Sequence, residues 1–163
     1  MKPHLKYAIT LVSAFYFQTG FCSPDLTFNE SSENHESRYV LSNYTGWDQT
    51  QSTPYSLVRS VMRIDWSSRK INSQVILTGS SLRNLLDSQS IQDTCNRVFE
   101  WTVAGIEYVA LGPNSTLSDR FSDSDYLQRF PNAYQYSFSN LAWVEGQAHT
   151  GSSESKLSCE GRL

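Results

Sequence analysis

Basic residues are scarce in this chain and form no run along the sequence. The 163 residues include 13 Lys and Arg against 16 Asp and Glu, which gives a formal net charge of −3. A protein that binds nucleic acid through phosphate contacts normally presents a basic patch or stripe. The sequence therefore predicts no tight nonspecific binding to nucleic acid.

Long apolar runs are also missing beyond the N-terminus, so no later segment is expected to span a bilayer. The one apolar run, residues 7–17, follows a basic N-terminus, which is the layout of a secretory signal peptide. We expect a signal over 1–20 with cleavage between Gly20 and Cys22; the small residues ending at Ala14 offer an earlier site. Removing the signal takes away two basic residues and leaves a mature net charge of about −5 (11 − 16). The mature protein is expected to be secreted, with no membrane segment.

Three sequons, Asn-x-Ser/Thr, agree with passage through a secretory pathway. They lie at Asn29, Asn43 and Asn114. Aromatic residues make up 13% of the chain, lysine is scarce, and Ser and Asn are frequent. This composition suits a stiff extracellular β-rich domain, and the length suits a single domain, which we expect to be monomeric.

Cysteine and histidine each occur three times. The histidine, cysteine and carboxylate residues are not spaced like metal ligands, so neither a metal nor a cofactor is expected. Three cysteines, Cys22, Cys95 and Cys159, allow one disulfide with three possible pairings.

The first half of the chain predicts an arm followed by a helix. Residues 21–52 are polar with scattered aromatics, and we expect an irregular N-terminal arm with one short strand near Arg38–Leu41. Thr53-Pro54 is typical of a helix start. Apolar residues then recur at helical spacing and predict a helix over 54–69; the pattern comprises Leu57, Val61 and Ile64.

The second half predicts mainly strands. A short helix is expected over 80–87, and apolar residues then alternate with polar ones, which predicts strands over 97–103, 134–138 and 141–149. A long loop is expected between 112 and 131. The fold class is α+β, with one helix packed on an antiparallel sheet over residues 53–163.

Two residues in the predicted strands could carry chemistry. A carboxylate can take the proton from a ribose 2′-hydroxyl as it attacks phosphorus, and an imidazolium can protonate the leaving 5′-oxygen. Glu100 and His149 lie on the less apolar sides of their strands, so periodicity allows them to converge on one phosphate. The opposing hypothesis is that Glu100 is a solvated surface residue and that His149 only donates a hydrogen bond to a backbone carbonyl.

The segment Phe99-Glu100-Trp101-Thr102-Val103, together with Gly146-Gln147-Ala148-His149-Thr150-Gly151 and the terminal Cys159, resembles the fungal guanyl-specific ribonucleases. It is equally similar to the ribonuclease-like secreted effectors of plant-pathogenic fungi such as powdery mildews. The resemblance implies a helix on a curved antiparallel sheet, with Glu100 as base and His149 as acid. Under the family's strand order, Cys159 lies on an edge strand out of reach of Cys95, which favours a Cys22–Cys159 disulfide.

The chain also departs from that family. No histidine lies between Ile71 and Asn96, and Tyr134-Gln135 stands where the family has an arginine. Gln135 and Trp143 remain as candidate substrate-binding residues, with Trp143 able to stack a base. Loss of a catalytic cation such as the family's histidine or arginine commonly lowers the rate by roughly 10² to 10³, so weak or no activity is expected.

Three functions remain open from the sequence. The first is a secreted ribonuclease-like effector, weak or inactive as an enzyme, that binds a host protein or RNA, beside or inside a host cell, and suppresses defence. The second is an active secreted endoribonuclease that forms a 2′,3′-cyclic phosphate. The third is a noncatalytic secreted surface domain.

Overall fold

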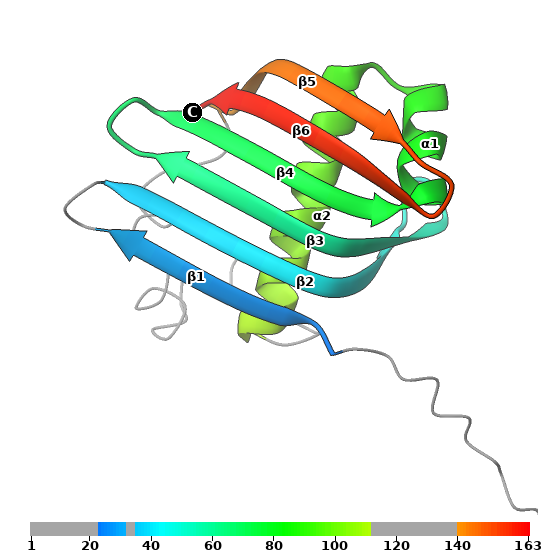
Figure 1. The fold of residues 1–163 in the computed structure, drawn as a ribbon, viewed down its shortest axis with the longest axis horizontal. Helices are drawn as coiled ribbons and strands as arrows, with labels where there is room; N and C mark the ends of the chain where they lie inside the picture. Colours follow the sequence, from blue (N-terminus) through cyan, green and yellow to red (C-terminus); the bar gives the residue numbers. More distant parts are fainter. Residues whose placement is uncertain (1–22, 32–34, 112–139) are drawn as a thin grey trace, which may run out of the picture.

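The computed structural model describes residues 23–31, 35–111 and 140–163 of the chain. These residues form an α+β fold in which two helices cover one face of a six-stranded antiparallel sheet (Figure 1). The strand order across the sheet is β1-β2-β3-β4-β6-β5. The predicted α+β class is confirmed.

The first four strands follow one another as a meander, each paired antiparallel with the next. Their bounds are β1 Asp25–Ser31, β2 Glu36–Asp48, β3 Thr53–Asp65 and β4 Lys70–Thr78. Along most of β2, β3 and β4, buried and exposed residues alternate, because successive side chains of a strand point to opposite faces of the sheet. One face of the meander is therefore apolar and the other polar.

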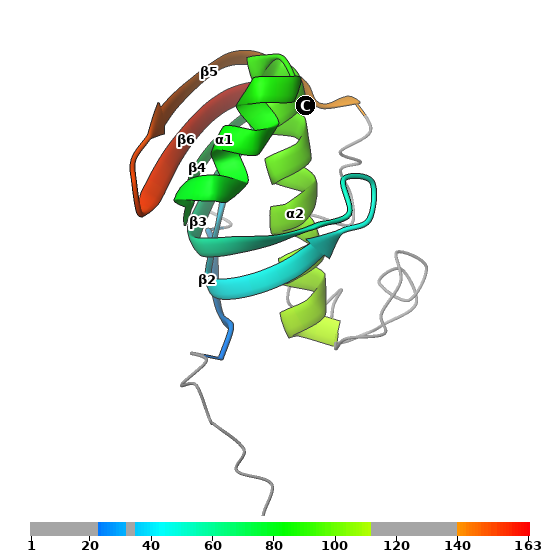
Figure 2. The same cartoon turned by 90° about the vertical axis from the view of Figure 1, so that its right-hand side faces the viewer.

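Helices α1 (Gly79–Ser88) and α2 (Ile91–Leu111) pack on the apolar face of the sheet (Figure 2). A capping pair precedes α2: the Ser90 hydroxyl accepts a hydrogen bond from the backbone N–H of Asp93 at 3.2 Å and donates one to its carboxylate at 2.7 Å. Further along, Gly105 permits close approach to the sheet, since a Cβ there would lie 2.5 Å from the Leu41 side chain.

A C-terminal hairpin completes the sheet. It consists of β5 (Ala142–Thr150) and β6 (Glu154–Arg162). Strand β6 pairs with β4 and lies inside the sheet, whereas β5 forms its edge. The strand predicted over 141–149 is confirmed, as is the short helix predicted over 80–87.

The hydrophobic core lies between the sheet and the two helices. The Tyr55 ring of β3 stacks on Trp101 of α2 with 4.2 Å between ring centroids, and the hydroxyls of Ser60 and Thr102 are 3.1 Å apart in a buried hydrogen bond. Fully burying one aliphatic side chain contributes about 1.5–3 kcal/mol. The fully buried residues include Leu41, Leu57, Leu77, Leu82, Val98 and Leu157.

One disulfide, Cys95–Cys159, joins α2 to β6, with 6.0 Å between the Cα atoms. The predicted Cys22–Cys159 pairing is therefore wrong. The prediction assumed that Cys95 precedes a strand in the plane of the sheet and that Cys159 lies on an edge. Cys95 instead lies on a helix that crosses the sheet face, and β6 is flanked by β4 and β5.

Two predicted elements have the wrong type. Residues 54–69 contain most of strand β3 rather than a helix, and residues 97–103 belong to helix α2 rather than to a strand. In β3 the buried positions run at a spacing near two, whereas in α2 they recur at helical spacing. The α2 pattern includes Val98, Trp101, Thr102 and Gly105.

The predicted irregular N-terminal arm over 21–52 is also wrong in its described part. Strands β1 and β2 lie in this stretch, and β2 pairs with β3 from Glu36 to Asp48. Most of the polar residues that suggested an arm lie on the solvent-facing side of β2, whereas Ser37 and Asp48 are buried. The strand predicted over 134–138, and with it Gln135, lies outside the described residues, as do the signal peptide and Cys22.

Candidate functional site

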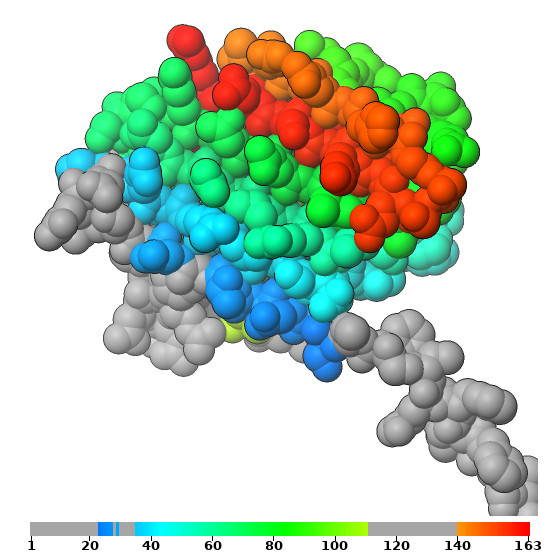
Figure 3. Space-filling model, viewed as in Figure 1, coloured from blue at the N-terminus to red at the C-terminus, as the bar shows by residue number. Residues whose placement is uncertain are grey.

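The face of the sheet turned away from the helices is the candidate site (Figure 3). Side chains of alternate residues on β2, β3, β4 and β6 form this open face. Four cations gather at its centre and line one hollow of about 410 Å³. We call this group the basic face: Arg38 from β2, Arg59 and Arg63 from β3, and Lys156 from β6.

The strand register brings these four cations together. Arg38 lies directly opposite Arg63 in the β2–β3 ladder. Arg59 and Lys156 both pair with Ile76 of β4, one from each side. Cations from three different strands thus surround the hollow. Its other lining residues include Val61, Gln74, Ile76 and Ser158.

Among the residues that the structure describes, no carboxylate forms an ion pair with the four cations of the basic face. The ion pairs in the described residues are both made by Arg97 of helix α2, which contacts Asp48 at 3.8 Å and Glu100 at 3.0 Å. Like charges directly opposite each other in a sheet are destabilising. The fold therefore tolerates a cost at Arg38 and Arg63 that an anionic ligand would relieve.

Neighbouring hollows on the open face have a different charge. A hollow of about 520 Å³ combines Arg38, Arg63 and Lys70 with Glu36 and Asp65. Another, of about 290 Å³, contains two carboxylates and no cation; its charged residues are Glu145 and Glu160. The 410 Å³ hollow is lined by cations without acidic residues, so it is the best fit for an anion.

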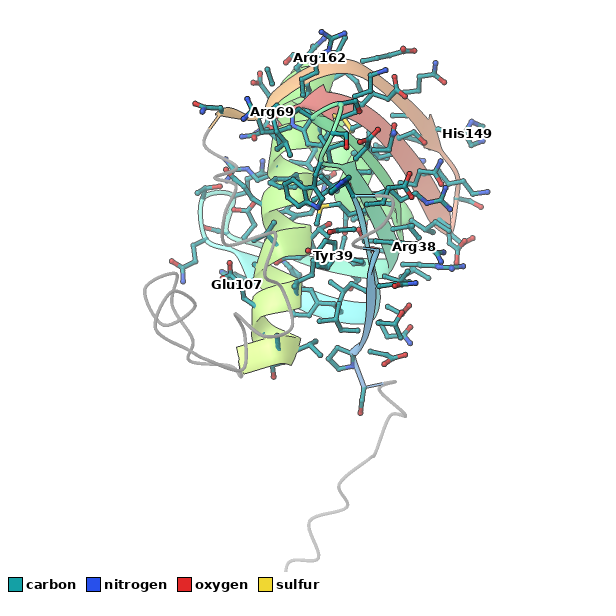
Figure 4. The ribbon with its side chains drawn as sticks, turned by 90° about the vertical axis from the view of Figure 1, so that its left-hand side faces the viewer. Arg38, Tyr39, Arg69, Glu107, His149 and Arg162 are labelled. Carbon is teal, nitrogen blue, oxygen red and sulfur yellow. A yellow bond between two sulfur atoms is a disulfide. The ribbon has the colours of Figure 1, made fainter. Side chains whose placement is uncertain are left out.

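The two predicted catalytic residues lie on opposite sides of the sheet. His149 of β5 is exposed and pairs with Lys156 in the β5–β6 ladder, so it shares the open face; in Figure 4 it points away from α2, as does Arg38. Glu100 lies on α2, which covers the other face, and its carboxylate accepts hydrogen bonds from Arg97 at 3.0 Å and Asn96 at 3.5 Å. The fold does not bring Glu100 and His149 together.

Trp143, the predicted base-stacking residue, faces the helices. Its ring packs edge-on against Phe99 of α2 with 5.7 Å between centroids, and the side chain is half-buried. This position gives it a packing role within the core rather than a place on the open face.

The buried carboxylate of Asp48 has a structural role. It accepts hydrogen bonds from the backbone and hydroxyl of Thr50, at 3.0 and 2.6 Å, and from the indole N–H of Trp101 at 3.1 Å. Burial by itself raises the pKa of Asp48, but these hydrogen bonds and the Arg97 cation outweigh it and lower the pKa below its ordinary value. Burial also raises the pKa of the neighbouring Tyr55 hydroxyl. The group fixes the β2–β3 turn to α2.

Within the described parts of the chain, no group of three or more His, Cys, Asp or Glu residues is placed to hold a metal ion. None of the helices there is long and apolar enough to cross a membrane. No protein-family model, curated protein or solved structure matches the chain.

The sequence reasoning missed the basic face because its members are far apart in the chain. Arg59 and Arg63 are four positions apart, which places them on the same side of a strand. Correct assignment of β3 could have revealed this pair. Adding Arg38 and Lys156 requires the strand order, which the sequence pattern does not contain.

Proposed function

We propose that this protein is a secreted, ribonuclease-like effector that binds RNA on its basic face and does not depend on cleavage for its action. The observation that carries the proposal is the cluster of Arg38, Arg59, Arg63 and Lys156, with no carboxylate lining their hollow. Secretion follows from the predicted signal peptide. Suppression of host defence is the biological role that the family resemblance implies.

The chemistry of the basic face favours phosphate groups. A guanidinium matches two phosphate oxygens with parallel hydrogen bonds, and three of the four cations are arginines. The remaining polar side chains of the hollow, Gln74 and Ser158, add neutral hydrogen-bonding groups. A polymer with phosphates at regular intervals can place a separate phosphate against each of several cations on neighbouring strands.

The separation of Glu100 from His149 supports binding rather than cleavage. General acid and base must both come within hydrogen-bond reach of the same reacting group. RNA on the open face would have the sheet between it and Glu100. Of the carboxylates on the same face as His149, Glu36, Asp65, Glu145 and Glu160 line the neighbouring hollows, whereas Glu154, two residues from Lys156, does not.

Salt dependence of RNA binding tests the proposal. Each phosphate neutralised on a single strand contributes about −0.7 to the slope of log K against log salt, so four contacts predict a slope of about −3. Arg59→Gln should weaken binding and reduce the slope to about −2. The measurement is fluorescence anisotropy of a labelled single-stranded RNA titrated with the mature protein at several salt concentrations.

Arg83→Gln is the matched control, since Arg83 is an exposed arginine on α1 whose one hydrogen bond here, at 3.4 Å, is to the carbonyl of Gly151. It removes the same charge without touching the basic face. The proposal fails if the wild-type protein does not bind RNA, or if Arg83→Gln lowers affinity and slope as much as Arg59→Gln does.

A further inference from the structure

Trp47 is a large aromatic side chain exposed on the surface. It is 60% exposed, whereas Trp66 and Trp101 are 6% and 5% exposed and Trp143 is half-buried against α2. The residue lies near the end of β2, opposite Pro54 of β3. Trp is enriched at interfaces, where its large ring contacts a partner.

The neighbours of Trp47 show which face it occupies. Asp48 is buried and bonded to Trp101 of α2, and a Cβ on Gly46 would run into the Tyr55 side chain, which stacks on the same Trp101. Both neighbours therefore face the helices. Since successive residues of a strand alternate, Trp47 projects from the open face, the same face as the four cations.

The β2–β3 pair forms a track from Trp47 to the basic face. Arg59 is five residues from Pro54 along β3, and Arg63 is nine. Measured along the strand, these separations are about 17 and 30 Å at ~3.3 Å per residue. The open-face positions in between carry small hydroxyl side chains, Ser42, Thr45 and Ser56, of which Thr45 and Ser56 bond to each other at 3.3 Å. These hydroxyls can bond phosphate or sugar.

We propose that the open face binds single-stranded RNA along the β2–β3 pair, with one base stacked on Trp47 and the backbone phosphates on Arg59, Arg63 and Arg38. This inference rests on the proposed RNA-binding function and specifies its ligand. A base within a duplex is already stacked on both sides, whereas a base in a single strand is free to stack on an indole. The span matches the site sizes of about 4–16 nucleotides found for single-strand-binding surfaces with stacking aromatics.

Substitution of Trp47 tests the stacking contact. Trp47→Ala should weaken binding of single-stranded RNA about tenfold and leave the salt slope unchanged, because no phosphate contact is lost. Trp47→Phe should recover part of the affinity. Bound RNA should quench indole emission in the wild-type protein and much less in Trp47→Ala. Val144→Ala is the matched control, since Val144 is 61% exposed on β5, away from the track.

Four outcomes would overturn the inference. Trp47→Ala could weaken binding no more than Val144→Ala does. RNA duplex of the same sequence could bind as tightly as the single strand. Trp47→Ala could change the salt slope as strongly as Arg59→Gln does. Binding to phosphatidylserine vesicles, rather than to RNA, could be the activity that Trp47→Ala removes. In the first three outcomes the basic face could still bind RNA. The proposed function itself is rejected if the wild-type protein does not bind RNA, or if the slope difference between Arg59→Gln and Arg83→Gln is lost.

Discussion

At the scale of single residues, Asp48 shows how this small fold uses a charged group inside its core. Three hydrogen bonds and the Arg97 cation surround the carboxylate at the end of β2. A buried charge is stable only when its hydrogen-bonding capacity is satisfied. Asp48 thus orders the turn that carries Trp47, so it acts on the open face indirectly.

Asp48→Asn should destabilise the protein by about 2 kcal/mol, because hydrogen bonds to a charged acceptor contribute roughly 1.5–3 kcal/mol. The lowered pKa sets the pH dependence: a carboxyl with a lower pKa when folded stabilises the fold above its unfolded value of about 4, and that contribution is lost as pH falls through the folded pKa. Urea unfolding at neutral and acidic pH should therefore show the stability difference between the variant and wild type shrinking with acid. Asp87→Asn, on the exposed side of α1, should change stability by no more than about 0.5 kcal/mol; a pH-independent effect of Asp48→Asn would contradict this account.

At the scale of elements, the sequence predicted correctly where one signal dominated and failed where two competed. The helix over 80–87 and the strand over 141–149 have boundaries and spacing that fit one element type. In β3, Leu57, Val61 and Ile64 satisfy a helical spacing, but Tyr55, Leu57, Met62 and Ile64 are the apolar residues buried against the helices. Pairing with β2 and β4 decides between the two patterns, and that information is not local.

The disulfide is a second element-scale feature that the sequence left open, because it depends on α2 crossing β6. The disulfide closes a loop between Cys95 and Cys159, which are 64 residues apart in the sequence. The chain-entropy model gives about 4 kcal/mol for a loop of this length. Replacing both cysteines by serine should lower the free energy of unfolding by about that amount.

Urea unfolding of the double variant, compared with the wild type under oxidising conditions, measures this effect. Reduction of the wild type should bring its unfolding midpoint close to that of the variant. An unchanged midpoint after reduction would show that packing between α2 and β6 holds the two elements together without the covalent link.

At the scale of the whole molecule, the sheet separates two kinds of surface. The helix-covered face contains the core, the disulfide and the Arg97 ion pairs, and the other face carries the basic residues and Trp47. The chain is acidic overall, at −3, yet its strand order concentrates cations in one hollow. Net charge therefore led to a wrong expectation about a basic patch, since the sign of a whole chain does not determine the sign of one face.

This two-sided arrangement predicts that RNA is bound and left intact. Incubation of the mature protein with a guanylyl dinucleotide or a longer RNA should yield no 2′,3′-cyclic phosphate, because Glu100, the carboxylate that the proposed family resemblance pairs with His149, is on the other side of the sheet. His149→Ala should retain RNA affinity within about threefold, since His149 is on the edge strand β5 and is not one of the four cations of the basic face. His35→Ala is the matched control, as His35 is an exposed histidine beside the start of β2. Cyclic phosphate that is formed by the wild type and His35→Ala, and lost in both His149→Ala and Glu100→Gln, would instead require the two residues to act on one phosphate and would reject a purely binding role.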